Sequence, residues 1–404
     1  MTSLHPSSPK PSSPKPSPRP PRRIALVAAC PFPTSQGSQV FIHQLACALT
    51  SAGHEVHVVA YGFGEYAQET PYRVHRTPAW VPSRKLRAGP SLWKPLLDAL
   101  LALRLLGVCR RERIEVIHAV NYEAAFVGAA ARLFLRVPVV YHAHGLLAME
   151  LPNYFDRPAA RRLAATAGRI IERLLLRCAQ AIVTLTEHDA AYLRARARSS
   201  PAVTTIRPGI AVPADDAAAP TPPVEAPPVF VYAGNLDRYQ GLDVVLAAFA
   251  RVVLRFPGAR LVVTTSSDAA PLAAQAARLG IGGRVTVLAG LPFAETTAAI
   301  RAATIALVPR SVAYGFPIKL LNYMALGVPV ILCCREYDGI GDGENAVLCG
   351  RTAEAFAEAM ASLAGDPERR ARLAAAARRT GDDLYRWDDA VRRIEEVYAS
   401  VLGR

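Results

Sequence analysis

Short apolar segments recur along this chain, and each is followed by a stretch whose apolar residues have helical spacing. Residues 24–29 (IALVAA) predict a strand that is buried on both faces, as in a parallel sheet. A helix is expected over 39–51, and Gly53 separates it from a second strand over 55–61. Because strand–helix–strand units of this kind build doubly wound sheets, the pattern predicts an α/β fold.

The same pattern continues in two series. The expected strands cover 115–119, 137–142, 180–185, and then 229–234, 260–265, 284–288, 305–308 and 329–333. Since 404 residues are many for one core, we predict two Rossmann-like domains. The predicted organisation is a disordered Pro/Ser/Lys tail (1–22), an N-terminal domain (23–210), an Ala/Pro/Asp linker (211–228), a C-terminal domain (229–383) and an amphipathic helix (384–404) that could pack on either half.

The net charge of the chain is strongly positive. The formal value is +14, and the five cations of the tail leave about +9 for the remainder. This charge suits a partner with phosphates or an anionic membrane surface, and a general preference for arginine explains it equally well. The sequence gives no indication of a nucleic-acid partner.

The cysteines and the hydropathy indicate the compartment. Seven cysteines are scattered without any Cys-x-x-Cys pair, which predicts buried thiols rather than disulfides or metal ligands. No segment is apolar over the length of a membrane span, and the N-terminus lacks the apolar core of a signal peptide. We therefore expect a cytoplasmic protein.

One helical segment, residues 91–113, is rich in leucine and is flanked by basic residues. It could rest on the inner face of an anionic membrane as a peripheral contact, or it could be an ordinary helix that covers a Rossmann-like sheet. We favour the covering helix.

A phosphate-binding corner is predicted in the stretch 310–329 (RSVAYGFPIKLLNYMALGVP), which follows the apolar strand 305–308. A Gly-Phe-Pro turn leads into a helix start that contains Lys319 among apolar residues. Helix N-termini present unpaired N–H groups and a positive dipole end, and they bind anions. A lysine in this apolar setting needs an anionic partner to offset its desolvation.

Several separated segments together resemble the retaining glycosyltransferases of family 4, also described as bacterial group 1 glycosyltransferases. The segments are PFPTSQGSQVFIHQLACALTSAGHEVHVV, VVYHAHG, AIVTLTEHDAAYL with IRPGI, VYAGNLDRYQGLDVVLAAF and GFPIKLLNYMALGVPVI. The resemblance covers nearly all of 23–402. It implies the GT-B fold, with two Rossmann-like doubly wound domains that face a central cleft.

The resemblance also implies an activity. Such an enzyme moves a sugar, typically a hexose, from a nucleotide-sugar donor to a hydroxyl acceptor with retention of configuration. Fixed cations and helix N-termini stabilise the leaving diphosphate, so no metal is required, and the sequence has no Asp-x-Asp pair. We expect no cofactor. The acceptor could be a sugar, a lipid-linked sugar or a small molecule of the cell envelope or of metabolism.

The resemblance places His144, at the end of VVYHAH, near the transferred sugar. His142 and His118 are weaker candidates, because packing or capping explains them as well. Gly37, with Ser38 beside it, allows the first loop to approach the diphosphate. We assign catalytic roles to His144, Lys319 and Arg238.

The chain departs from the family pattern at four positions. Asn235 and Gln240 stand where the family has the Arg and Lys that grip the diphosphate, so Arg238, Lys319 and Arg310 are the expected substitutes. Tyr314 and Asn322 replace the two glutamates of the E-x7-E pattern. We expect Asn322 to bind the ribose, and Tyr314 with the backbone of Gly315, Phe316 and Pro317 to approach the donor sugar.

Two alternative functions remain open at this point. One is an isomerase of the same fold that epimerises a nucleotide sugar, which would need acid/base carboxylates in the cleft. The other is a degenerate, non-catalytic protein that binds a partner through the cleft. The changes at the four family positions favour the second alternative over the first.

Overall fold

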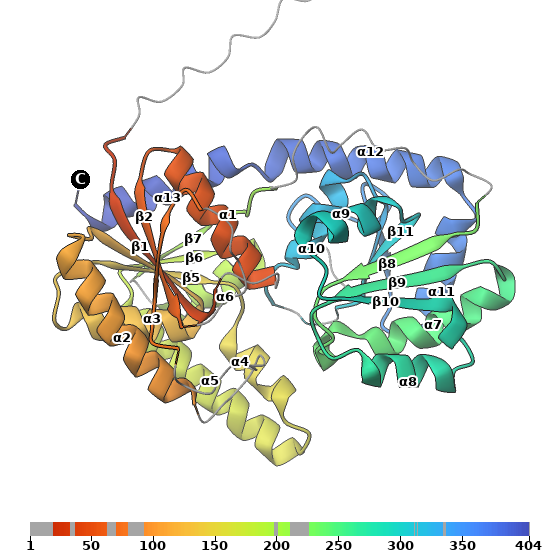
Figure 1. Ribbon diagram of the computed structural model, residues 1–404, viewed down its shortest axis with the longest axis horizontal. Helices are drawn as coiled ribbons and strands as arrows, with labels where there is room; N and C mark the ends of the chain where they lie inside the picture. Colours follow the sequence, from red (N-terminus) through yellow and green to blue (C-terminus); the bar gives the residue numbers. More distant parts are fainter. Residues whose placement is uncertain are drawn as a thin grey trace, which may run out of the picture.

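The computed structural model describes residues 19–32, 37–62, 70–79, 93–197, 201–210, 226–310, 312, 314–333 and 337–403. Two α/β halves lie side by side, and helices cover both faces of each sheet (Figure 1). Most of the expected tail (1–22) and most of the expected linker (211–228) lie outside the described residues.

The N-terminal half is built on one parallel sheet. Its strands are β1 (Arg23–Pro31), β2 (Glu55–Tyr61), β3 (Arg73–Arg76), β4 (Val116–Val120), β5 (Val139–Ala143), β6 (Ala181–Thr184) and β7 (Ala202–Thr205). Within the described residues they pair in the order β3-β2-β1-β4-β5-β6-β7, so the direction of winding reverses between β1 and β4. The helices are α1 (Gly37–Ser51), α2 (Lys94–Arg111), α3 (Asn121–Arg132), α4 (Leu147–Glu150), η1 (Leu151–Tyr154), α5 (Pro158–Cys178) and α6 (Glu187–Ala197).

The C-terminal half repeats this plan. Its strands are β8 (Val229–Ala233), β9 (Arg260–Thr265), β10 (Val285–Ala289), β11 (Ile305–Val308), β12 (Val330–Cys333) and β13 (Val347–Cys349). Their order in the described part is β10-β9-β8-β11-β12-β13, with the reversal between β8 and β11. The helices are η3 (Arg238–Gln240), α7 (Leu242–Arg255), α8 (Ala270–Arg278), η4 (Gly282–Arg284), α9 (Phe293–Arg301), α10 (Ile318–Ala325), α11 (Ala353–Ala364), α12 (Pro367–Leu384) and α13 (Trp387–Val401).

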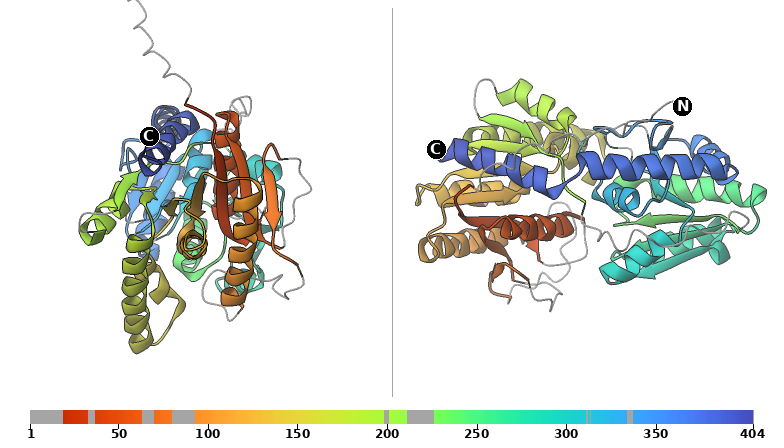
Figure 2. Two further views of the ribbon diagram at one scale, coloured as in Figure 1. Left: turned by 90° about the vertical axis from the view of Figure 1, so that its left-hand side faces the viewer. Right: turned by 90° about the horizontal axis from the view of Figure 1, so that it is seen from above.

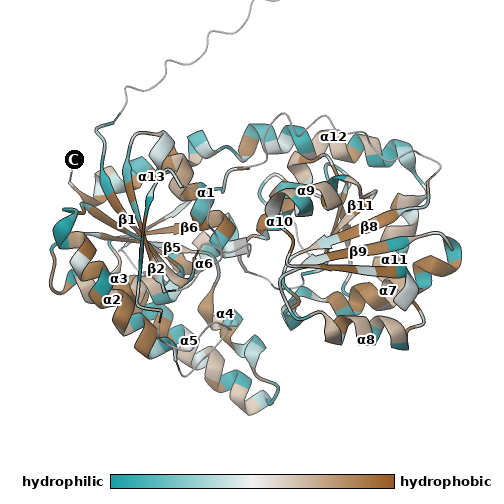
Figure 3. Cartoon of the chain, in the orientation of Figure 1, coloured by the Kyte–Doolittle hydropathy of each residue, from teal (hydrophilic) through white to brown (hydrophobic). Residues whose placement is uncertain are grey.

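Continuous apolar runs form the central strands because both of their faces are covered. In β1, Ile24 and Leu26 join one apolar cluster, while Ala25 and Val27 join another on the opposite face. Colouring by hydropathy shows the strands of both sheets as largely apolar (Figure 3). The prediction of a doubly wound α/β fold is confirmed.

The C-terminal helices connect the two halves. Helix α12 runs along the C-terminal half, and α13 then returns to the N-terminal half (Figure 2). Helix α13 packs against α1 and buries Val391, Ile394 and Tyr398. The last helix therefore packs on the N-terminal sheet, a choice that the sequence had left open.

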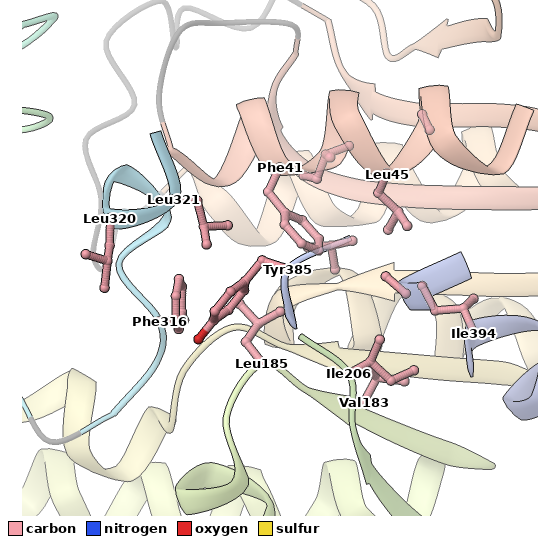
Figure 4. Close-up of a cluster of buried hydrophobic side chains, with 14 of the residues drawn as sticks. Phe41, Leu45, Val183, Leu185, Ile206, Phe316, Leu320, Leu321, Tyr385 and Ile394 are labelled. Carbon is pink, nitrogen blue, oxygen red and sulfur yellow. The ribbon is translucent and has the colours of Figure 1, made fainter. Parts of the chain in front are cut away.

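One apolar cluster contains side chains from both halves. It includes Phe41 and Leu45 of α1, Leu320 and Leu321 of α10, and Ile394 of α13 (Figure 4). Part of the apolar burial in this cluster therefore depends on the presence of both halves.

Sequence reasoning missed three short edge strands, β3, β7 and β13. Strand β3 has the sequence RVHR, whose ends are exposed, and it lacks the apolar run that marks the central strands. Strand β13 is only three residues long. All three are held by pairing to a neighbour (β2, β6 and β12, respectively) rather than by their own hydropathy.

Helix α2 falls within the leucine-rich segment 91–113. It buries Leu97, Leu101 and Leu105 in the N-terminal half, as a covering helix does, while Trp93 and Leu103 remain 48% and 67% exposed. Within the described residues, no helix combines the length and the apolar character that crossing a membrane requires.

Candidate active site

A cavity of about 360 Å³ opens between the two halves, at the carboxyl ends of both parallel sheets. Residues after β1, β4 and β5 line one side, and residues after β8, β9 and β11 line the other. Both points at which the winding reverses therefore face one space, which is where open α/β sheets bind ligands. The size is that of small-molecule sites.

The Gly-Phe-Pro turn connects β11 to α10 in the wall of this cavity. Gly315 has a φ of 68°, and a Cβ on it would lie 2.5 Å from the carbonyl oxygen of His144, so only glycine fits there. Helix α10 then begins at Ile318 without a side-chain cap. The first residues of α10 line the cavity, so its N-terminus is available to an anion.

Lys319, in the first turn of α10, lies against polar and aromatic groups of the C-terminal half. Its Nζ donates to Oε1 of Gln240 at 3.2 Å and lies 3.7 Å from the ring centroid of Tyr232. Burial, with a further contribution from the charge of Arg310, lowers the pKa of Lys319 well below its usual value. A bound anion would offset this desolvation and restore the full charge.

Arg310 follows β11 and lies near Lys319. Its Nη2 donates to the carbonyl oxygen of Tyr314 at 2.8 Å, and its guanidinium carbon lies 5.4 Å and 5.6 Å from the ring centroids of Tyr314 and Tyr239. These contacts hold the guanidinium at the cavity, so a second cation is fixed beside the N-terminus of α10.

Polar atoms without partners converge on the cavity. Among the described residues, no hydrogen-bond partner is present for four buried atoms of cavity-lining side chains: Nε2 of His144, Oδ1 of Asn235, Oγ1 of Thr264 and Nε of Arg310. Buried polar atoms are nearly always paired in folded proteins. Their grouping at one cavity indicates a site built for a polar ligand.

His144 belongs to a row of histidines at the carboxyl ends of β4 and β5. Burial lowers the pKa of His144 to about 3, so its imidazole is neutral at physiological pH. His118 is fully buried and pairs with the hydroxyl of Tyr398 at 2.7 Å and with Nδ1 of His142 at 2.9 Å. His144 lines the cavity, whereas His118 and His142 connect the sheet to α13.

The structure brings most of the expected site residues together. Those that line the cavity are His144, Asn235, Gln240, Arg310, Tyr314, Phe316, Pro317, Lys319 and Asn322. Gly37 is the first residue of α1, and its neighbour Ser38 lines the cavity.

Two expected residues are placed differently. The side chain of Arg238 is 83% exposed and forms an ion pair with Asp156 at the surface, so it is not among the cavity-lining residues. The N–H of Gly315 donates to Oδ2 of Asp189 at 2.8 Å, so this amide is not free for a ligand. The contact joins the C-terminal turn to α6 of the N-terminal half.

Sequence reasoning missed several polar residues on the N-terminal side of the cavity, namely Lys94, Asn121, Tyr122, Glu123, Glu150 and Tyr154. Asn121 directly follows an apolar strand and has a φ of 69°, a strained conformation that is common at functional sites. Its place at a strand end was a usable signal. Glu150 lies on the short helix α4, where no pattern marks it.

The comparisons with known proteins agree with this architecture. Residues 36–209 match the family model described as glycosyl transferase 4-like domain, and residues 215–380 match glycosyl transferases group 1. The chain is 27% identical to the D-inositol 3-phosphate glycosyltransferase of Rhodococcus jostii (94% of this chain, 89% of the relative). It is 28% identical to that of Thermobispora bispora (91% and 90%).

Solved structures show the same fold. Sucrose-phosphate synthase from Thermosynechococcus elongatus has a TM-score of 0.76 at 20% identity, covering 95% of this chain and 99% of that chain. Anabaena HepE in complex with UDP and glucose has a TM-score of 0.69 at 16% identity (94% and 100%). The two matched domains, the two sheets and the cleft between them lead to one conclusion: the chain is a glycosyltransferase of GT-B fold that belongs to the family with a 4-like N-terminal and a group 1 C-terminal domain.

Proposed function

We propose that this enzyme transfers a sugar, of the hexose type, from a nucleoside diphosphate donor to a hydroxyl acceptor, with retention of configuration and without a metal ion. The observation that supports this most directly is the grouping of Lys319, Arg310 and four unpartnered buried polar atoms at one cavity between the two sheets. A ligand with a diphosphate and several hydroxyls offers partners to all of them.

The donor diphosphate binds at the N-terminus of α10. Lys319 and Arg310 contact it, while Asn235 and Gln240 contribute hydrogen bonds in place of the Arg and Lys of the family. Asn322 lies in the second turn of α10 and binds the ribose. Structures of Anabaena HepE, which has the same fold, are complexes with UDP, with UDP-glucose, and with UDP and glucose, which supports this class of donor.

The chemical step places negative charge on the departing diphosphate. Two cations and a helix N-terminus, fixed before the reaction, stabilise that charge most when it is fully developed. The acceptor oxygen bonds to the anomeric carbon from the N-terminal side as the bond to the diphosphate oxygen breaks on the same face, and the hydroxyl proton passes to the departing diphosphate. Attack and departure on one face retain the configuration. The neutral imidazole of His144 hydrogen-bonds a sugar hydroxyl there and contributes no charge of its own.

The epimerase and the non-catalytic alternative are distinguished from transfer by products. Glu123 and Glu150 line the cavity, so carboxylates for an epimerase are present. An epimerase leaves the nucleotide sugar intact as an isomer, a transferase releases nucleoside diphosphate, and a non-catalytic protein changes neither. Mass detection after incubation with UDP-, GDP- and ADP-sugars separates the three. We expect slow release of nucleoside diphosphate, because water replaces the acceptor. If none of the nucleotide sugars released nucleoside diphosphate, the proposal would be contradicted.

We further propose that the enzyme acts in the cytoplasm and touches an anionic membrane surface. The six described cysteines are free thiols, as in a reducing compartment. Leu163, Ile170 and Leu174 of α5 are exposed beside several arginines of the same helix, and Leu103 of α2 is exposed as well. Flotation with vesicles of anionic lipid, compared with zwitterionic vesicles, tests this contact. Equal recovery from both would contradict it.

A further inference from the structure

The two sides of the cavity differ in charge. The charged side chains among its described lining residues are Arg310 and Lys319 in the C-terminal half, and Lys94, Glu123 and Glu150 in the N-terminal half. The C-terminal side is therefore cationic and suits a diphosphate. The N-terminal side has a different composition, and it is where the acceptor must bind if the donor occupies the other.

The one described lysine on the N-terminal side is already neutralised. Lys94 forms an ion pair with Glu123 in which both side chains are mostly buried. Behind them, Asp98 accepts a hydrogen bond from the hydroxyl of Tyr61 at 2.6 Å. Glu150 adds a further carboxylate, so the formal charge of the described groups of this side is negative.

The charged hydrogen-bonding groups of this side that are not already paired with a cation are acceptors. The hydroxyl of Tyr154 donates to Oε1 of Glu150 at 3.1 Å, and that of Tyr61 donates to Asp98. Because both hydroxyl protons are already used in these hydrogen bonds, neither tyrosine donates to a ligand. Carboxylate oxygens accept hydrogen bonds from hydroxyl and ammonium groups. A phosphate needs donors and positive charge, and like charges in a site of reduced dielectric repel each other.

Burial is the first cause of the raised pKa values on this side. Burial raises the pKa of Glu150, and burial together with the charge of Glu123 raises the pKa of Cys30 to about 12. The charge of Glu123 also raises the pKa of Asp98, after the larger effect of burial. These acids are therefore harder to ionise than in water, and a phosphate placed among them would meet the same desolvation cost.

We propose that the N-terminal side of the cavity, through Glu123 and Glu150, selects an acceptor that is an uncharged or amine-bearing polyol and rejects the phosphorylated form. The proposal rests on the proposed function and names its acceptor class. It separates this chain from relatives whose name specifies inositol 3-phosphate as the substrate.

Matched acceptors test the proposal with the full chain and the donor found in the screen. The pairs are glucose with glucose 6-phosphate and myo-inositol with inositol 3-phosphate, and glucosamine serves as the amine. We expect kcat/KM to be at least about tenfold higher for the unphosphorylated member of a pair. Equal use, or preference for the phosphate, overturns the proposal.

Inhibition provides a second readout where transfer is slow. A compound that occupies the acceptor side excludes water and inhibits donor hydrolysis. The unphosphorylated and amine-bearing compounds should inhibit more strongly than the phosphates. No inhibition by any compound at millimolar concentration also overturns the proposal, because carboxylates placed to bind hydroxyls would then bind none.

A charge variant makes the test specific. Glu123→Gln removes one carboxylate and frees Lys94, so it should reduce the discrimination against the phosphorylated acceptor by about tenfold or more. Glu354→Gln is the matched control, because Glu354 pairs with Arg251 at the exposed surface of the C-terminal half. An unchanged ratio in Glu123→Gln contradicts the proposal.

The failure of this inference can be distinguished from failure of the proposed function. Turnover of the donor with preference for phosphorylated acceptors refutes this inference alone, whereas no turnover of any nucleotide sugar refutes the proposed function.

Discussion

We expect donor binding to depend most on Lys319. Substitution by alanine removes a cation in the first turn of α10 and leaves Gln240 without this donor. Because charge-assisted hydrogen bonds are about twice as strong as neutral ones, we expect the affinity for UDP or GDP to fall at least about tenfold. Isothermal titration calorimetry measures the change.

Arg238→Ala is the control for this prediction. The sequence also assigned Arg238 to the diphosphate, but its side chain is exposed and pairs with Asp156 instead. Exposed ion pairs contribute little, so affinity in this variant should stay within about twofold of the original. If Arg238→Ala lost affinity and Lys319→Ala kept it, the two assignments would have to be exchanged.

The lowered pKa of Lys319 predicts how donor binding depends on pH. A diphosphate favours the charged lysine, so its pKa must rise in the complex. Binding is therefore tightest below the pKa of the free protein and weakens as the pH rises above it, where a proton must be taken up. A series above about pH 6, where a terminal phosphate has lost its second proton, isolates this effect. Lys319→Ala should abolish the slope; a slope that persists in it would come from another group.

At the scale of elements, apolar runs and glycines predicted most of the sheet, and they failed where a strand depends on a neighbour. The run IALVAA is apolar because both faces of β1 are covered, so its pattern is local. Strand β3 forms through pairing with β2 and has no such pattern. The Gly-Phe-Pro turn before α10 allowed the C-terminal side of the site to be predicted from the sequence. Glu150, in contrast, lies on a four-residue helix whose position only the fold determines.

Helix α13 is an element of the N-terminal half in energetic terms. Tyr398→Phe would remove the hydroxyl that pairs with Nδ1 of buried His118. A buried polar group without its partner costs about 1 to 3 kcal/mol, so we expect the free energy of unfolding to fall by that amount. Urea denaturation measures it.

The control for this prediction is Arg392→Ala on the same helix. Arg392 forms ion pairs with Asp389 and Glu396 at the exposed face, so its loss should change stability by less than about 0.5 kcal/mol. Similar losses in the two variants would mean that helix propensity, and not the contact with His118, determines the stability of α13.

At the scale of the whole molecule, two of the described contacts between the halves involve the turn before α10. The amide of Gly315 donates to Asp189, and Nδ2 of Asn153 donates to the hydroxyl of Tyr314 at 3.1 Å. Both join the turn before α10 to the N-terminal half. The N-terminus of α10 and the N-terminal side of the cavity are therefore joined through the same turn, so movement of one half relative to the other would change the geometry of the cavity.

The shared apolar cluster makes the stability of the two halves interdependent. Leu321 is 2% exposed on α10, and α10 contacts α1 of the other half. Leu321→Ala should lower the free energy of unfolding by about 2 to 5 kcal/mol. Because the cavity it leaves lies in the shared cluster, amide hydrogen exchange should accelerate in β1 and β4 as well as in β8 and β11.

The control is Leu246→Ala, in an apolar cluster that belongs to the C-terminal half alone. It should lower the free energy of unfolding by a similar amount and leave β1 and β4 protected from exchange. Equal protection of β1 in the two variants would show that the halves unfold independently and that the cluster in Figure 4 does not couple them.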